Sequence, residues 1–163
     1  MADWYVHNVR EFPWFVNEKF GARAMLVPFD EDIQVGVRVH VLEPGKPSTM
    51  YHRETGQEGF LVVEGECLLI VEGEERTLRR WDYFHCPPGV THAFVGAGDG
   101  PCVLVTLGLR GGSIVYERND TALSHGAGVE EETDTPSVAY APFPKWEDGK
   151  PESWPELPWN RGS

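Results

Sequence analysis

Short strand-like runs, separated by turn residues and with no helical pattern between them, restrict the fold of this chain more than any other feature. The clearest run covers residues 33–41, where apolar residues occupy every second position from Ile33 to Val41 and so share one face of a strand. A Pro44–Gly45 turn follows it, and similar turns separate the later runs. The predicted strands are residues 22–29, 33–41, 48–54, 58–63, 67–71, 75–80, 83–86, 92–95, 102–109 and 113–117.

This series of short strands predicts an all-β fold, either a sandwich or a barrel. A parallel α/β fold needs helices between its strands, and none is predicted here. Residues 1–21 are expected to form an N-terminal arm, residues 22–117 the barrel, and residues 118–163 an acidic extension rich in Pro and Trp. Residues 120–124 are expected to form one helical turn within that extension.

The C-terminal extension has the composition of an extended segment, yet it contains Trp146, Trp154 and Trp159. Disordered chains are poor in aromatic residues, so we expect these side chains to anchor the extension on the barrel or on a partner subunit. One form of this arrangement is a lid over the barrel mouth. Deletion of residues 143–163 should then change ligand affinity more than stability.

The net charge of −12 over 163 residues limits the partners of this chain. Such an acidic surface repels nucleic acid and anionic lipid, so neither is expected to bind. An anionic small molecule is still compatible, because a bound metal ion can reverse the field inside a pocket. Three cysteines without a CxxC pair, a start unlike a signal peptide, and the lack of a long apolar run predict a cytoplasmic protein with no membrane span.

Two short segments carry the residues best suited to chemistry. His52 and Glu54 lie two apart in a predicted strand and so point to the same side, and Glu58 begins the next strand after a Thr–Gly–Gln turn. His92 opens another strand after a Pro–Pro–Gly turn. If these side chains meet inside the barrel, their buried charge needs compensation, and a cation is the natural partner.

The spacing of these residues resembles the two sequence motifs of the cupins. The matching residues are His52, Glu54, Glu58 and Gly65 for the first motif and Pro87, Gly89 and His92 for the second. Glu54 stands where the family usually has a second histidine, Trp81 where a glycine usually opens the second motif, and Gly96 where an asparagine is usual. The resemblance implies a double-stranded β-helix (jelly-roll) barrel, with a short N-terminal arm and an extended C-terminal tail.

By this resemblance, His52, Glu58 and His92 bind a divalent metal ion, with Fe, Mn, Ni and Zn as the candidates. Glu54 is either a fourth ligand or a general acid–base whose pKa is raised toward neutrality by burial. The contrasting interpretation is a cupin that has lost its metal, with these polar side chains satisfied by their neighbours. Apolar residues on the same strand faces are expected to line a substrate pocket: Met50, Phe60, Val62, Phe84 and Phe94.

The predicted function is that of a metal-binding cupin, working as a mononuclear non-haem enzyme of the dioxygenase or isomerase type. Its substrate is expected to be a small organic molecule that chelates the metal through oxygen. The alternative is a non-catalytic module that binds a small molecule and holds a structural metal or none. Cupins commonly pair through outward apolar residues, here Tyr51, Leu61 and Val63, so a homodimer is expected.

Overall fold

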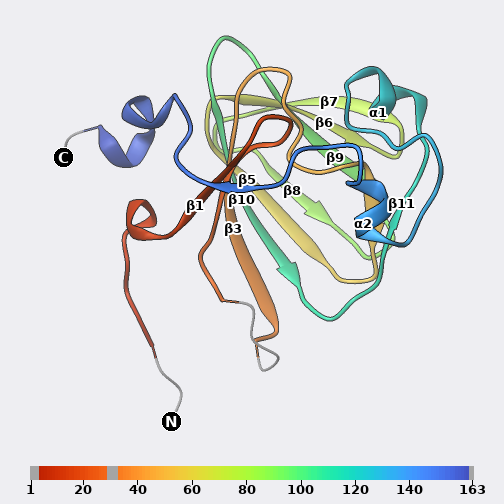
Figure 1. Cartoon of the computed structure of the whole chain (residues 1–163), viewed down its shortest axis with the longest axis horizontal. Helices are drawn as coiled ribbons and strands as arrows, with labels where there is room; N and C mark the ends of the chain where they lie inside the picture. The colour runs from red at the N-terminus through yellow and green to blue at the C-terminus, as the bar shows by residue number, and fades with distance from the viewer. Residues whose placement is uncertain (1–3, 29–32, 162–163) are drawn as a thin grey trace.

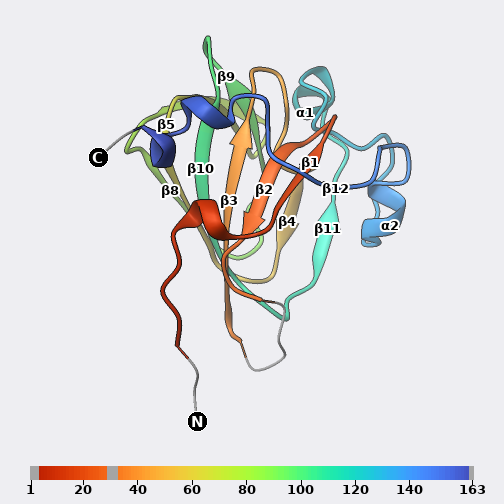
Figure 2. The ribbon, with the colours of Figure 1, turned by 60° about the vertical axis from the view of Figure 1, so that its left-hand side comes forward.

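Two antiparallel β-sheets packed face to face form the centre of the computed structural model, which describes residues 4–28 and 33–161 (Figures 1 and 2). The larger sheet has the strand order β12-β1-β2-β3-β10-β5-β8 and the smaller sheet the order β11-β4-β9-β6-β7. Strands of the larger sheet are β1 (Trp14–Asn17), β2 (Gly21–Met25), β3 (Val35–Leu42), β5 (Glu58–Glu64), β8 (Tyr83–Cys86), β10 (Cys102–Leu109) and β12 (Glu147–Asp148). Those of the smaller sheet are β4 (His52–Glu54), β6 (Glu66–Val71), β7 (Glu74–Arg79), β9 (His92–Ala97) and β11 (Ile114–Tyr116).

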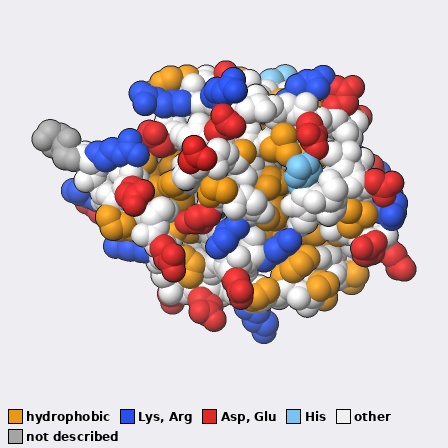
Figure 3. Space-filling view, turned by 90° about the horizontal axis from the view of Figure 1, so that it is seen from above, with side chains coloured by type: hydrophobic (Ala, Val, Ile, Leu, Met, Phe, Trp, Pro, Cys, Tyr) orange, Lys and Arg blue, Asp and Glu red, His pale blue; other side chains and the backbone are white. Residues whose placement is uncertain are grey.

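The helices are short and lie at the ends of the chain. They are η1 (Val9–Glu11), α1 (Asp120–Ser124), α2 (Pro136–Ala139), η2 (Trp154–Glu156) and η3 (Pro158–Asn160). None of the helices in the described ranges is both long and apolar enough to cross a membrane. On the face seen in Figure 3, Lys and Arg side chains are interspersed with Asp and Glu, so this face has no continuous basic surface.

The all-β jelly roll predicted from the sequence is confirmed, and each predicted strand has an observed counterpart. The first predicted strand is observed as β2, and its predicted end at Phe29 lies outside the described residues. The helical turn expected at residues 120–124 is α1. Two strands were not predicted: β1, within the expected arm, pairs with β2 on one side and with β12 of the extension on the other.

The two faces of β3 show where the core lies. Val39 and Val41 belong to a cluster on the outer face of the larger sheet, whereas Leu42 belongs to the core between the sheets. Since alternate residues share a face, Arg38 and His40 point inward with Leu42. The polar face of this strand is therefore turned to the interior, and its apolar face is turned outward and covered by the chain ends.

The C-terminal extension is held against the outer face of the larger sheet. Trp154 and Trp159 each lie with their ring centroids 5.3 Å from that of Trp14 in β1. Leu157, between them in sequence, is fully buried in the same cluster. The prediction that tryptophans anchor the extension is confirmed for this part of it, and Figure 2 shows the blue C-terminal segment beside the N-terminal strands.

Two of the outward apolar residues expected at a dimer interface are covered by this chain itself. Tyr51 is buried with Ile70 and Ala122, because α1 and the segment after it pack over the smaller sheet. Val63 packs against the cluster that contains Trp154 and Trp159. The sequence pattern identified outward positions correctly, but it did not reveal that the chain ends fold back over them.

Trp81 has a left-handed backbone, with φ of 75°, at the position where a glycine usually opens the second cupin motif. This conformation costs an L-residue about 1–2 kcal/mol, and the indole recovers little of it because the residue is 65% exposed. We expect Trp81→Gly to raise the free energy of unfolding by about 0.5–1 kcal/mol in urea denaturation. Trp81→Ala keeps the strained backbone and should give no gain; an equal gain would assign the effect to the indole instead.

Candidate metal centre

The candidate ligands come from both sheets. His52 in β4 and His92 in β9 lie directly opposite each other in the smaller sheet. Glu58 begins β5 of the larger sheet, and the turn over residues 55–57 carries the chain from one sheet to the other. The convergence expected from the sequence is present: one ligand atom from each of these three residues lies within 4.8 Å of the other two.

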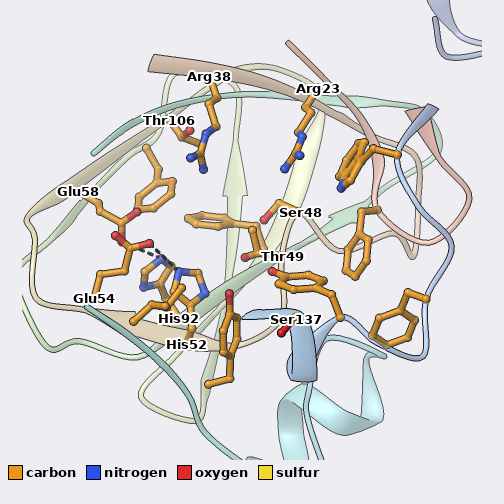
Figure 4. Close-up of a pocket in the computed structure, with 18 of the residues that line it drawn as sticks. Arg23, Arg38, Ser48, Thr49, His52, Glu54, Glu58, His92, Thr106 and Ser137 are labelled. Carbon is orange, nitrogen blue, oxygen red and sulfur yellow. Dashed lines mark ion pairs between the residues drawn. The ribbon is translucent and has the colours of Figure 1, made fainter. Parts of the chain in front are cut away.

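Backbone contacts orient both imidazoles toward this meeting point. His52 Nδ1 lies 2.7 Å from the carbonyl oxygen of Met50, and His92 Nδ1 lies 3.1 Å from that of Val90. A carbonyl oxygen can only accept, so each neutral ring carries its proton on Nδ1 and a lone pair on Nε2. Figure 4 shows the two rings side by side with the carboxylates of Glu54 and Glu58 above them. Fixing the tautomer through Nδ1 is the usual preparation of a histidine for metal binding through Nε2.

Glu58 provides the test of whether a cation fits. Its Oε2 lies 3.3 Å from His92 Nε2, and the same oxygen is buried without a hydrogen-bond partner. An ionised carboxylate and an imidazole lone pair that face each other need either a proton or a cation between them. Two imidazole nitrogens and one carboxylate oxygen are the donor set of many non-haem metal sites, so these residues fit a divalent ion.

Burial and charge shift the pKa values of two of these residues in opposite directions. Burial, reinforced by the negative charge of Glu54, raises the pKa of Glu58 to about 7. Burial, reinforced by the charge of His52, lowers the pKa of His92 to about 3. His92 is therefore neutral at pH 7, as a metal ligand must be.

Glu54 lies beside the group of three rather than within it. Its Oε1 is 3.5 Å from His52 Nε2. Burial raises the pKa of Glu54, but the interaction with His52 and the charges of His92 and Arg38 outweigh burial, so the net pKa is lowered. The expectation that burial would bring Glu54 toward neutrality was wrong in direction, because this carboxylate is partly exposed, is held by a hydrogen bond from His52 and lies near the charge of Arg38.

The candidate ligands open onto a cavity of about 690 Å³, a size suited to a small organic molecule. Phe60 and Phe94 line it, as expected. Met50, Val62 and Phe84 do not belong to its lining. Met50 precedes β4 and packs with Phe20 and Tyr116, whereas Val62 lies deeper in the core and Phe84 stacks behind Phe60. Strand alternation gave the correct faces, but it carries no information on depth along a face.

Several residues of the cavity wall were not predicted. Arg23 and Arg38 enter from the larger sheet, and Tyr140 and Trp146 come from the extension, which forms one wall. Arg38 is also shared, with both carboxylates, by a smaller adjoining cavity of about 220 Å³. The sequence feature that could have indicated Arg38 is the polar face of residues 33–41. That face predicts a cavity wall only when it is known to be the inner face of the strand.

Cys86 contacts His92 at Nδ1, the ring nitrogen that does not face Glu58. Its Sγ lies 3.4 Å from His92 Nδ1. Burial raises the pKa of the Cys86 thiol to about 12, so the group is protonated in the metal-free protein. The expectation that this cysteine is a small buried residue agrees with its 2% exposure.

His40 makes stability sensitive to acid. It is buried beside Arg38 and Arg23, and burial followed by these two charges lowers its pKa from 6.5 to about 3. A histidine that must stay neutral in the fold stabilises it above pH 6.5, and this contribution is lost as the pH falls toward 3. We expect His40→Leu to reduce the slope of unfolding free energy against pH by up to about 1.4 kcal/mol per pH unit over this range. Urea denaturation at a series of pH values measures the slope of unfolding free energy against pH. Equal slopes for the wild type and His40→Leu would contradict the prediction.

The fold and the site together define a jelly-roll protein with an internal His/Glu/His group able to hold a metal ion. Residues 38–108 match the family model described as Cupin_2: Cupin domain. This match covers the region that contains both motifs, so the cupin resemblance seen in the sequence is supported over residues 38–108. Among curated proteins, none matches this chain.

Solved structures support the same fold. A sugar phosphate isomerase of the cupin superfamily from Silicibacter pomeroyi is 20% identical, with a TM-score of 0.60 over 70% of this chain and 87% of that one. An RmlC-like cupin from Shewanella frigidimarina is 20% identical, with a TM-score of 0.55 over 67% and 93%. A double-stranded β-helix protein from Klebsiella pneumoniae is 20% identical, with a TM-score of 0.56 over 69% and 97%. At this identity the likeness concerns the fold alone.

Proposed function

We propose that this protein is a metal-dependent cupin enzyme that binds a small organic substrate through oxygen atoms at a divalent ion. The observation that carries the proposal is the convergence of His52, Glu58 and His92 within 4.8 Å on the wall of a cavity large enough for such a substrate. We place the protein in the cytoplasm, where its three free cysteines stay reduced.

His52, Glu58 and His92 would hold the ion, which when bound supplies positive charge that polarises a carbonyl or enol oxygen of the substrate. The backbone carbonyls of Met50 and Val90 keep both Nε2 atoms aimed at that point. Phe60 and Phe94 provide an apolar surface at the reacting end of the cavity. These groups bind and orient the substrate and exclude water from it.

Glu54 is the residue that we assign to proton transfer. Its lowered pKa keeps it ionised, and its carboxylate lines the same cavity as the three ligands. It can take a proton from the carbon next to a polarised carbonyl and return that proton to a neighbouring atom, which is isomerase-type chemistry. Proton transfer of this kind requires a carboxylate beside the three ligands, so the position of Glu54 supports the isomerase-type assignment.

The test is metal analysis of protein purified without chelators, followed by substrate screening with the loaded protein. We expect about one equivalent of a single transition metal, and solvent deuterium exchange into an enolisable substrate that Glu54→Gln abolishes. Metal without exchange into any carbonyl substrate would favour the non-catalytic binding module. The lack of every transition metal, together with failure to take up added metal, would overturn the proposal.

We also propose that the protein is a homodimer. Four apolar residues on the outer face of the larger sheet are each at least 40% exposed: Val35, Tyr83, Leu107 and Leu109. Leu109 lies opposite Val35 in register, and Leu107 lies opposite Val37. These four residues form a continuous apolar patch. Leu107→Asp should convert the dimer to a monomer in light scattering, whereas Val138→Asp, at an exposed apolar residue on α2, should not. A monomeric wild-type protein would contradict the proposal.

A further inference from the structure

The wall of the cavity that faces the two histidines carries two arginines. Arg23 of β2 lies opposite His40 of β3 in register, and Arg38 is two residues before His40 on the same face. The two guanidiniums are therefore diagonal neighbours on the inner face of the larger sheet, and both line the cavity. In Figure 4 they enter from the same side and point toward the middle of the cavity.

Neither arginine has an acidic partner. In the described part of the chain, no carboxylate forms an ion pair with Arg23 or Arg38. Arg23 Nε is buried without a hydrogen-bond partner. Burial, followed by the charge of Arg38, lowers the pKa of Arg23 to about 10, which shows that the two positive charges oppose each other in a partly desolvated place.

A structural role explains only part of this arrangement. Arg38 acts electrostatically on Glu54 and Glu58, whose pKa values it lowers, so it balances the acidic end of the cavity. Arg23 is different: its guanidinium carbon lies 3.9 Å from the ring centroid of Trp146, and this stacking fixes its plane but satisfies none of its donors in that plane. A buried donor left unpaired is costly, so the Nε–H of Arg23 calls for an acceptor, and Arg38, its diagonal neighbour on the same wall, can share that acceptor.

We infer that Arg23 and Arg38 bind the anionic group of the ligand, a phosphate or a carboxylate, while its oxygen donors reach the metal ligands across the cavity. The fork of each guanidinium matches two oxygen atoms of such a group. Ser48, Thr49 and Thr106 lie on the wall between and beside the arginines and can donate further hydrogen bonds (Figure 4). With a divalent ion at Glu58, the cavity carries a net positive charge, although the whole chain is acidic.

This inference deepens the proposed function by naming the charge class of the substrate, but its test needs no turnover. Calorimetric titration of metal-free protein with inorganic phosphate and with acetate measures the arginine site separately from the metal site. We expect one of the two anions to bind, and Arg23→Met and Arg38→Met each to weaken it by about tenfold or more. Arg76→Met, which removes an exposed arginine paired with Glu74, should leave the affinity unchanged. Tighter binding of phosphate than of acetate assigns a phosphorylated ligand, and the reverse assigns a carboxylate.

Two results would overturn the inference: no binding of either anion to the wild-type protein, or equal binding to the wild type and to both Met variants. If circular dichroism shows that a Met variant is unfolded, Arg38→Lys and Arg23→Lys replace it. Lysine keeps the charge but lacks the planar fork, so these variants should bind with intermediate affinity, and wild-type affinity in both would count against the inference. A protein that binds the anion but no metal would refute the proposed function and leave this inference standing.

Discussion

Replacement of His92 by alanine should abolish metal binding. His92 Nε2 faces Glu58 and lies in a ring pair with His52 whose centroids are 4.8 Å apart, so its loss removes one of three donors. Loss of a residue that merely orients a ligand typically costs 10–100-fold in affinity, so we expect more than about a hundredfold for the ligand itself. Metal content by mass spectrometry after gel filtration, together with a competition titration, measures the effect. His52→Ala should have the same result.

His85 offers a matched control for both variants. It lies in β8, exposed and on the opposite face from Cys86, so His85→Ala should keep the wild-type metal content. His92 is almost completely buried, and circular dichroism must show that the alanine variant is folded. His92→Gln, which leaves a smaller void, is the second variant. Wild-type metal content in folded His92→Ala or His92→Gln would refute the assignment of all three ligands.

Glu54→Gln then decides the role of the ligand position at which this chain departs from the family pattern. Retained metal with lost proton exchange would assign Glu54 to acid–base chemistry. Metal lost to the same degree as in His92→Ala would make it a fourth ligand. The position of Glu54 favours the first result, because its Oε1 lies 3.5 Å from His52 Nε2 and Glu54 is outside the group of three convergent ligand atoms.

The candidate ligands could be predicted from the sequence because their positions depend on local features. His52 takes its direction from strand alternation, and the three-residue turn after Glu54 sets the direction of Glu58. The Pro–Pro–Gly turn sets that of His92, so each direction is fixed within a few residues of chain. The arginine wall could not be predicted in the same way. Alternation in residues 33–41 identifies two faces but not which is buried, and the usual assumption that the apolar face points inward is reversed here.

The reason for that reversal lies at the two ends of the chain. Val39 and Val41 can face outward because Trp14 and Leu157 cover them, and both covering residues are distant in sequence. A pattern in one strand carries no information on which distant segments will return to it. The same lack of long-range information explains why β1 and β12 were missed, and why Tyr51 and Val63 were expected to be uncovered.

Substitutions in the C-terminal extension should therefore have two kinds of effect. Those at Leu157 should change stability, and those at Trp146 should change anion affinity. Leu157 is fully buried between the extension and the outer face of the larger sheet, so Leu157→Ala should lower the free energy of unfolding by about 2–5 kcal/mol. It contacts no candidate ligand, and metal content and anion affinity should be unchanged in the folded protein. Denaturant unfolding and anion titration of the same preparation measure both quantities.

Trp146 is the matched residue at the cavity. It is only partly buried, so Trp146→Ala should cost less stability than Leu157→Ala, but it should weaken anion binding because the indole fixes the plane of Arg23. This separation revises the expectation for deletion of residues 143–163, which removes both residues and should reduce stability as well as affinity. If Leu157→Ala weakened the anion affinity as much as Trp146→Ala while remaining folded, the extension would act as one unit, and the stacking of Trp146 on Arg23 would not be the specific link between the extension and the ligand.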